Sequence, residues 1–294
     1  MIPMMVLSGA MFSFDKLNRT VGSINKVPLV AEFMVTRWSY EALMVHQYKS
    51  NKYATLPGNN SQPSLYDLDK SISMADFRQV YLMPELRKRF DWCVEEIETG
   101  KIQKHAGALK VLYNEIKKEL SLHPDSTATA KILPLLTPET FTKEASYMLE
   151  EFLEKMDNYY SEEFENVFNT QQRVIKYMQE QNDSLYKHLK NSCQNEHLGE
   201  IVKKSFENKK ILEFEGELVQ QIDPIYKDPT TTSLINVRTH FFAPRKYLAG
   251  RFWDTYWFNI SLIWIYTALL YAMLYFDGLK KLMDFFGRIS FKKK

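Results

Sequence analysis

The chain has 294 residues, 25% of them charged, and its 38 basic and 36 acidic side chains leave a formal net charge of +2. This near-neutral balance argues against nucleic acid as a partner. A mean hydropathy of −0.35 excludes a chain that lies wholly within a membrane. The length suffices for one or two domains with cores of their own.

The first apolar run, Ile2–Phe14, contains 13 residues without a charge. It is too short to span a bilayer, which takes about 20 residues, and it lacks the basic residues that begin a signal sequence. Two interpretations stay open: a short core helix, or the end of a longer membrane helix that begins before Met1. We expect the second.

An apolar and aromatic segment, Leu29–Tyr48, follows a short connector. Arg37 precedes Glu41 by four residues, so the two side chains share one face if the segment is helical. We expect a surface ion pair here, worth about a few tenths of a kcal/mol, rather than a catalytic pair.

The middle of the chain reads as a helical domain. Residues 57–71 are rich in Pro, Gly, Asn and Ser, which predicts a linker at which that domain begins. Helical patterns then cover the ranges 74–99 (with a kink near Pro84), 101–121, 138–181 and 184–207. Thr137 and Pro138 are suited to begin the third helix. Its apolar positions, Met148 and Tyr159 among them, recur mostly at three- and four-residue steps, which indicates one buried face in a helical bundle.

Beyond residue 208 the pattern changes. Lys210–Gln220 can pair as short strands or continue a helix, and both interpretations stay open. Turn-forming residues follow at 223–233. Residues 240–251 then look like a stalk that leads back to a bilayer.

The run Tyr256–Phe276 has 21 residues without a charge and spans roughly the 30 Å apolar core of a bilayer. Aromatic side chains such as Trp257 and Tyr275 gather near both ends, as at membrane interfaces. Asn259 is one of few polar residues within it and can bond within the helix or to a neighbouring helix. This pattern predicts a membrane-spanning helix.

Basic residues flank this run unequally. Six lie on its C-terminal side and four on its N-terminal side, each set within about 20 residues. The positive-inside rule therefore places the amphipathic tail, residues 279–294, in the cytoplasm. The helical domain is then extracytoplasmic. The expected fold class is a mainly α membrane protein with a C-terminal membrane helix and a large helical insertion outside the membrane.

Sequence motifs for chemistry are lacking. The chain has no Gly-rich phosphate loop, no Gly-x-Ser-x-Gly and no paired-His metal motif, so it offers no catalytic, cofactor-binding or metal-binding residues. Cys93 and Cys193 lie in predicted helices, and an extracytoplasmic location would permit a disulfide between them. Two separate thiols fit the sequence equally well.

Three motifs near the N-terminus carry a family resemblance. They are Leu7-Ser8-Gly9-Ala-Met-Phe-Ser-Phe14, Asp15-Lys-Leu-Asn18 and Arg37-Trp38-Ser-Tyr40-Glu41-Ala42-Leu43. In order and spacing they resemble the end of the permease domain in ABC exporters of the G-subfamily (the White and pleiotropic-drug-resistance type). Together with the C-terminal helix, the similar parts cover about a third of the chain.

The resemblance implies a layout for the whole chain. Residues 1–14 would end the fifth membrane helix, 15–56 would form a re-entrant connector in the outer leaflet, 57–250 an enlarged exterior loop, 251–278 the sixth membrane helix and 279–294 its cytoplasmic tail. The loop is far longer than is usual in the family, but bacterial members that fuse cassette and permease have a similarly enlarged one. Ser8 and Gly9 would let helices approach closely. Glu41 would be a polar group at outer-leaflet depth, paired with Arg37.

Function and partners also follow from the resemblance as expectations. The chain would line and cap the path of an exporter in the plasma or inner membrane. ATP and Mg²⁺ would bind a cassette that these residues do not contain, and the whole transporter would be an ATPase. The partners would be the bilayer, the rest of the transporter or a second half-transporter, and an extracytoplasmic protein. The alternative is a single-span anchored helical protein that acts as an interaction module.

Overall fold

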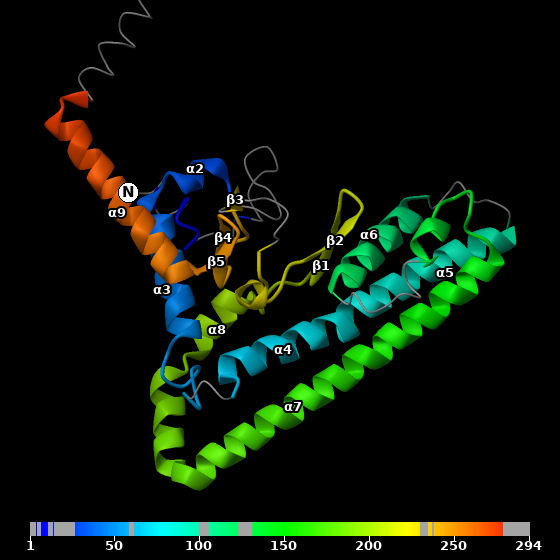
Figure 1. The fold of residues 1–294 in the computed structure, drawn as a ribbon, viewed down its shortest axis with the longest axis horizontal. Coiled ribbons are helices and arrows are strands. Elements are labelled where there is room, and N and C mark those ends of the chain that lie inside the picture. The colour runs from blue at the N-terminus through cyan, green and yellow to red at the C-terminus, as the bar shows by residue number, and fades with distance from the viewer. Residues whose placement is uncertain are drawn as a thin grey trace, which may run out of the picture. The chain divides into compact units, whose positions relative to one another are not determined.

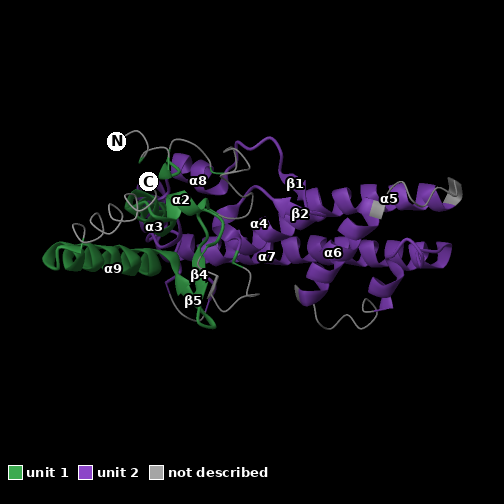
Figure 2. Cartoon of the chain, turned by 90° about the horizontal axis from the view of Figure 1, so that it is seen from above, with its two compact units in different colours: residues 1–47, 228–294 green, residues 48–227 purple. Residues whose placement is uncertain are grey.

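The computed structural model describes residues 4, 7–10, 14, 27–58, 62–99, 106–122, 131–229, 235–236 and 238–278. The chain forms two units: residues 1–47 with 228–294 make unit 1, and residues 48–227 make unit 2 (Figure 2). Unit 1 therefore joins both ends of the chain, and unit 2 is inserted between them. The unit boundaries precede the expected limits of the insertion, residues 57 and 250, by about 10 and 20 residues.

Unit 2 is mainly helical (Figure 1). Its helices are α4 (Leu65–Phe77), α5 (Met83–Thr99), α6 (Ala106–Leu122), α7 (Lys143–Cys193) and α8 (Glu196–Lys203). Helix α4 begins inside the segment predicted as a linker, so that prediction is wrong for residues 65–71. The reason is a capping box, in which Ser64 Oγ accepts from Asp67 N–H at 3.1 Å and Asp67 Oδ2 accepts from Ser64 N–H at 3.3 Å.

A π-helical turn, Arg78–Leu82, joins α4 to α5. It lies just before Pro84, whose ring nitrogen has no hydrogen to donate to the carbonyl of Val80. The turn absorbs this missing bond within a continuous helical path. The predicted interruption near Pro84 is confirmed.

Helix α7 is 51 residues long. Thr142 caps it by accepting from Ala145 N–H at 3.3 Å, so the predicted start at Thr137 and Pro138 is wrong. Asn182 adopts φ −163° and ψ 88°, and its side chain accepts from Leu185 N–H at 3.0 Å to restart the helix. The predicted break between residues 181 and 184 is confirmed.

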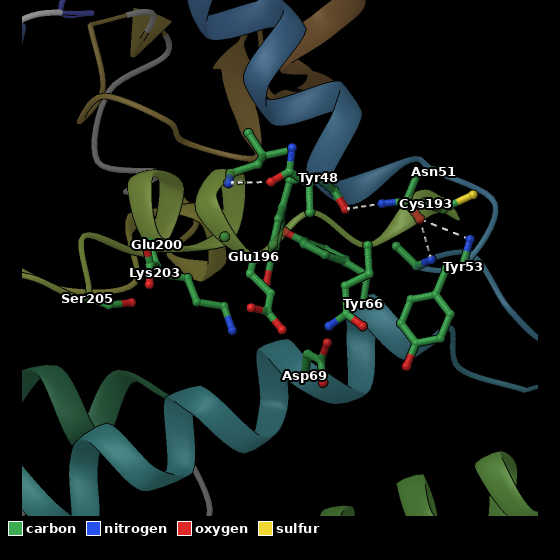
Figure 3. Close-up of a pocket in the computed structure, with 15 residues that line it drawn as sticks. Tyr48, Asn51, Tyr53, Tyr66, Asp69, Cys193, Glu196, Glu200, Lys203 and Ser205 are labelled. Atoms are coloured by element: carbon green, nitrogen blue, oxygen red, sulfur yellow. Dashed lines mark hydrogen bonds between the residues drawn. The ribbon is translucent and has the colours of Figure 1, made fainter. Parts of the chain in front are cut away.

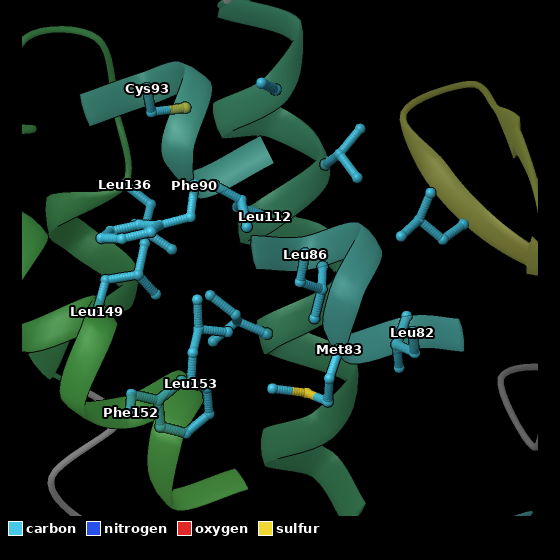
Figure 4. Close-up of a cluster of buried hydrophobic side chains, with 14 of the residues drawn as sticks. Leu82, Met83, Leu86, Phe90, Cys93, Leu112, Leu136, Leu149, Phe152 and Leu153 are labelled. Atoms are coloured by element: carbon cyan, nitrogen blue, oxygen red, sulfur yellow. The ribbon is translucent and has the colours of Figure 1, made fainter. Parts of the chain in front are cut away.

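Helices α5, α6 and α7 enclose the main core of unit 2 (Figure 4). Leu86, Leu112, Leu149 and Leu153 are at most 2% exposed, and burying such a side chain stabilises the fold by about 1.5–3 kcal/mol. Helix α7 buries one face in a helical bundle, as predicted, although Met148 and Tyr159 of the expected stripe are exposed.

A short hairpin follows α8 in unit 2. Strands β1 (Ile211–Phe214) and β2 (Glu217–Gln220) pair in antiparallel fashion. Glu215 and Gly216 join them with φ of 55° and 85°, which is the backbone of a tight hairpin turn. Of the two interpretations left open for residues 210–220, paired strands are the correct one.

Unit 1 contains the other elements. These are α2 (Leu29–Glu32), α3 (Val35–Lys49, up to residue 47), β3 (Ile235–Asn236), β4 (Arg245–Leu248), β5 (Arg251–Asp254) and α9 (Thr255–Tyr275). The strands form an antiparallel sheet in the order β3-β4-β5, so the segment expected to be a stalk is partly a sheet. Asp254 ends β5 and caps α9 by accepting from Tyr256 N–H at 2.9 Å.

Helix α9 is long and apolar enough to cross a membrane, and only 6% of its apolar window is buried. Trp264, near its middle, is 70% exposed. Among the described residues no second helix meets the same criteria of length and composition. The tail 279–294 and most of residues 1–26 lie outside the described residues.

Candidate functional site: a buried polar cluster in unit 1

Five polar side chains meet inside unit 1, and we call them the polar cluster: Glu32, Arg37, Glu41, Lys246 and Asn259. They come from α2, α3, β4 and α9. Arg37, Glu41, Lys246 and Asn259 are 0% exposed. Charged side chains are almost never fully buried unless they are paired.

Glu41 is the centre of the cluster. Its Oε1 accepts from Lys246 Nζ at 2.8 Å, and its Oε2 accepts from Asn259 Nδ2 at 2.9 Å. Lys246 Nζ also donates to Thr239 Oγ1 at 2.8 Å, and Asn259 Nδ2 to the carbonyl of Trp38 at 3.1 Å. These bonds connect α3 with β4 and with α9.

Arg37 completes the charge balance. Its Nη1 lies 3.4 Å from Glu32 Oε2 and 3.5 Å from Glu41 Oε2, and its guanidinium lies 3.9 Å from the ring centroid of Trp38. Within the described part of the chain the guanidinium makes these ion pairs and ring contacts but no hydrogen bond. Two acids and two bases therefore share the site, and their formal charges cancel.

The surroundings lower the pKa of both members of the central pair. Burial raises the pKa of Glu41, but Arg37, Lys246 and the hydrogen bond from Asn259 outweigh it and hold that pKa below its ordinary value. Burial lowers the pKa of Lys246, and Glu41 opposes this shift only in part. Each charge thus depends on the other to remain inside the unit.

The N-terminal elements run along α9 in the opposite direction. His46 stacks on Tyr256 with ring centroids 4.3 Å apart, and Trp38 bonds to Asn259. Tyr266 OH donates to the carbonyl of Glu32 at 3.4 Å. Tyr266 lies about 16 Å along the helix from Thr255 at 1.5 Å per residue. Helix α2 therefore lies beside the middle of α9.

Apolar side chains around α2 point outward. Leu29, Val30 and Phe33 are 59%, 50% and 73% exposed. Exposed apolar residues scattered singly are ordinary, but a contiguous group marks a surface that contacts lipid or protein.

The structure tests the expected ion pair directly. Arg37 and Glu41 do pair, but both side chains are fully buried, so the expectation of a surface pair is wrong. Lys246 and Asn259, from the C-terminal part of the chain, cover the pair. Sequence spacing places two residues on one helix face without saying what packs over that face.

The other motif residues meet at Phe241. Phe14 is buried and packs edge-to-face on Phe241 with centroids 4.9 Å apart, and Tyr40 stacks on it at 6.2 Å. Gly9 has φ +79°, and a Cβ there would lie 2.7 Å from a ring carbon of Phe241. The position therefore requires glycine.

Three further motif residues lie outside the polar cluster. Ser8 is buried, and its hydroxyl accepts from Ala10 N–H at 3.2 Å. Ala42 is buried on α3, whereas Leu43 is 60% exposed and lies outside the cluster.

Sequence reasoning missed Lys246 as a cluster residue, because it looked like one of the charges that flank a membrane helix. Asn259 did carry a signal, since an amide in an apolar helix bonds either within that helix or to a neighbouring one. Of these two alternatives the structure has the second, because Asn259 bonds to α3.

Both cysteines are free. Cys93 belongs to the same core cluster as Leu149 and Leu153, which lie early in α7 (Figure 4), whereas Cys193 is the last residue of that long helix. The two thiols are therefore too far apart for a disulfide, and of the two alternatives the separate thiols are correct. Burial raises the pKa of Cys93 to about 12, which makes its thiol unreactive at neutral pH.

Across the described residues, no group of His, Cys, Asp and Glu is placed to hold a metal ion. Comparison of the chain with protein-family models, with curated proteins and with solved structures gave no match.

Proposed function

We propose that this chain is the C-terminal permease portion of an ATP-driven exporter, with unit 1 as its last membrane helix and an adjoining re-entrant element. The observation that carries the proposal is the polar cluster, which ties α9 to α3 and β4 through fully buried charges. The proposal rests on the cluster's position against an apolar helix.

The first support for the proposal is the free-energy cost of burying these polar groups beside a membrane helix. Polar and ionisable groups at membrane depth are expensive, and they usually mark a working part of a membrane protein. A helix that only anchors a soluble domain gains nothing from Asn259 in its first two turns or from a buried Lys246 beside it. A membrane helix that alternates between two positions during transport does gain from Asn259 and Lys246, because their bonds define one of these positions.

The place of α2 is the second support. A short helix with outward apolar side chains that lies beside the middle of α9 fits a re-entrant element in the outer leaflet. The polar cluster would then act as a latch between α9 and this element. Closing the latch pairs all four charges, and opening it exposes them to the path of the substrate.

The driving chemistry would lie elsewhere in the transporter. ATP and Mg²⁺ would bind the cassette, for which these residues provide no phosphate loop. The residues of this chain would transmit the resulting movement through the latch. By the positive-inside count, residues 279–294 would be cytoplasmic in a plasma or inner membrane, and unit 2 would be extracytoplasmic.

A tagged form of the native protein tests the proposal. We expect a tag after Lys294 to purify the chain joined to, or in complex with, a nucleotide-binding cassette that hydrolyses ATP. Glu41→Gln should uncouple hydrolysis from stimulation by transported compounds, while Asp228→Ala, which alters a half-buried pair with Arg245 outside the polar cluster, should leave the coupling unchanged.

One outcome favours the alternative function. A protein of 34.7 kDa that purifies without a cassette and without ATPase activity would refute the exporter. It would favour a single-span anchored interaction module. The separate core of unit 2 and the exposed Tyr147 and Tyr177 of α7 are consistent with that alternative.

A further inference from the structure

Unit 2 contains a cavity of about 330 Å³ at the turn between α7 and α8 (Figure 3). Its walls come from the segment that follows α3, from α4 and from α8. Tyr48, Tyr66, Asp69, Glu196 and Lys203 are among its lining residues. Its volume is at the lower end of the range for small-molecule sites.

Asp69 and Lys203, which carry opposite charges, both line the cavity. Among the described residues these two side chains form no ion pair, although the charge of each shifts the pKa of the other. Gln171 Nε2 donates to Asp69 Oδ1 at 2.6 Å and fixes that carboxylate. A ligand with a donor and an acceptor can therefore bridge Asp69 and Lys203 across the cavity.

Burial makes this pair responsive to a ligand. It raises the pKa of Asp69, an effect that Lys203 and Gln171 only partly offset. Burial alone would lower the pKa of Lys203, but Tyr48, Asp69 and Asp223 together raise it. A bound cation would compensate the carboxylate, and a bound anion the ammonium group.

The aromatic wall is held in place before any ligand arrives. Tyr66 OH donates to the carbonyl of Ile225 at 2.7 Å, and the hydroxyls of Tyr48 and Tyr226 lie 2.7 Å apart. The rings of Tyr48 and Tyr66 meet edge-to-face with centroids 6.5 Å apart. Lys203 Nζ lies over the rings of Tyr48 and Tyr226, 5.8 and 5.4 Å from their centroids, so these rings help to hold the ammonium group of Lys203 at the cavity.

The charge of the lining favours a ligand that carries net positive charge. Its ionisable residues are three acids, Asp69, Glu196 and Glu200, and one base, Lys203. Glu196 and Glu200 are exposed at the rim, where they can meet a second positive group. The carboxyl groups thus outnumber the ammonium group by two.

We propose that this cavity binds a small basic zwitterion of the amino-acid class, with its ammonium group at Asp69 and its carboxylate at Lys203. The site uses residues of unit 2 alone and is independent of the exporter proposal.

Equilibrium dialysis of the full chain in detergent against radiolabelled L-lysine tests this. We expect saturable binding at one site. Cadaverine, which lacks the carboxylate, and glucose, which lacks both charges, should compete at least about tenfold more weakly, the factor expected for one lost charge-assisted hydrogen bond. Asp69→Asn and Lys203→Met should each weaken binding by a similar factor.

Lys209→Met is the matched control, because Lys209 is exposed and lies outside this cavity; it should bind L-lysine as the unaltered chain does. Equal competition by cadaverine, preferential binding of glucose, or no saturable binding of L-lysine up to about 10 mM would each overturn the proposal. The comparison of ligands uses the unaltered chain, so it decides the matter even if a variant fails to fold.

Discussion

Replacing Glu41 with alanine should destabilise unit 1 strongly. The side chain is 0% exposed and accepts from Lys246 and Asn259 at 2.8 and 2.9 Å. Its loss leaves a buried ammonium group and an excess of positive charge beside Arg37. Removing one member of a buried ion pair costs about 3–5 kcal/mol. In a unit of this size we expect the Tm to fall by roughly 12–20 °C.

Thermal unfolding followed by tryptophan fluorescence measures this effect. Four of the five tryptophans, all except Trp92, lie in unit 1, so the signal reports mainly on that unit. Asp228→Ala is the control in the same unit, since its pair with Arg245 is 30–41% exposed and its loss should cost less than the loss of a fully buried partner.

A double variant separates the ion pair from the loss of volume. Glu41→Ala with Lys246→Met should be more stable than Glu41→Ala alone, because no ammonium group remains buried without its partner. If the two substitutions add, or if Glu41→Ala costs no more than the Asp228 control, the polar cluster does not stabilise unit 1 as described.

Three further predictions use the same preparations. Gly9→Ala should lower the stability of unit 1 by about 1–3 kcal/mol, because the new Cβ meets Phe241 and φ is positive; an unchanged Tm in the fluorescence assay would contradict this. Asp69 has a pKa raised by burial, so its contribution to stability is lost as the pH rises from its ordinary pKa of 3.8 through the raised value. Asp69→Asn should therefore gain stability relative to the unaltered chain as the pH increases, and a pH-independent difference in Tm by circular dichroism would be inconsistent with it. A maleimide should modify the half-buried Cys193 in the folded chain and reach the buried Cys93 only after unfolding, as mass spectrometry of the peptides can determine.

Several features could be predicted from sequence because their causes are local. An uncharged run of 21 residues predicts a helix of membrane length whatever surrounds it. The interruption of the α-helix before Pro84 and the break at Asn182 likewise follow from the backbone chemistry of single residues. The start of α4 carried a local signal as well, in Ser64 and Asp67, but the turn-forming composition around it obscured that signal.

The buried face of α7 lay at the limit of such reasoning. Its period was correct, but Met148 and Tyr159, assigned to the buried stripe, are 39% and 43% exposed, whereas the adjacent Leu149 and Tyr160 are at most 1% exposed. A stripe on an isolated helix can turn by one residue without changing its period. The helices that pack against it select the side that is buried.

By itself, the sequence determined the helical character of the chain, the apolar α9 and the pairing of Arg37 with Glu41. Only the tertiary structure decided that this pair is buried. Its partners Lys246 and Asn259 are 205 and 218 residues from Glu41, and no periodic pattern extends over such a distance. The same holds for the cavity of unit 2, which Asp69 and Lys203 line together because α4 and α8 both pack against the turn Pro224–Tyr226. Local chemistry forms the elements, but long-range packing assembles the sites.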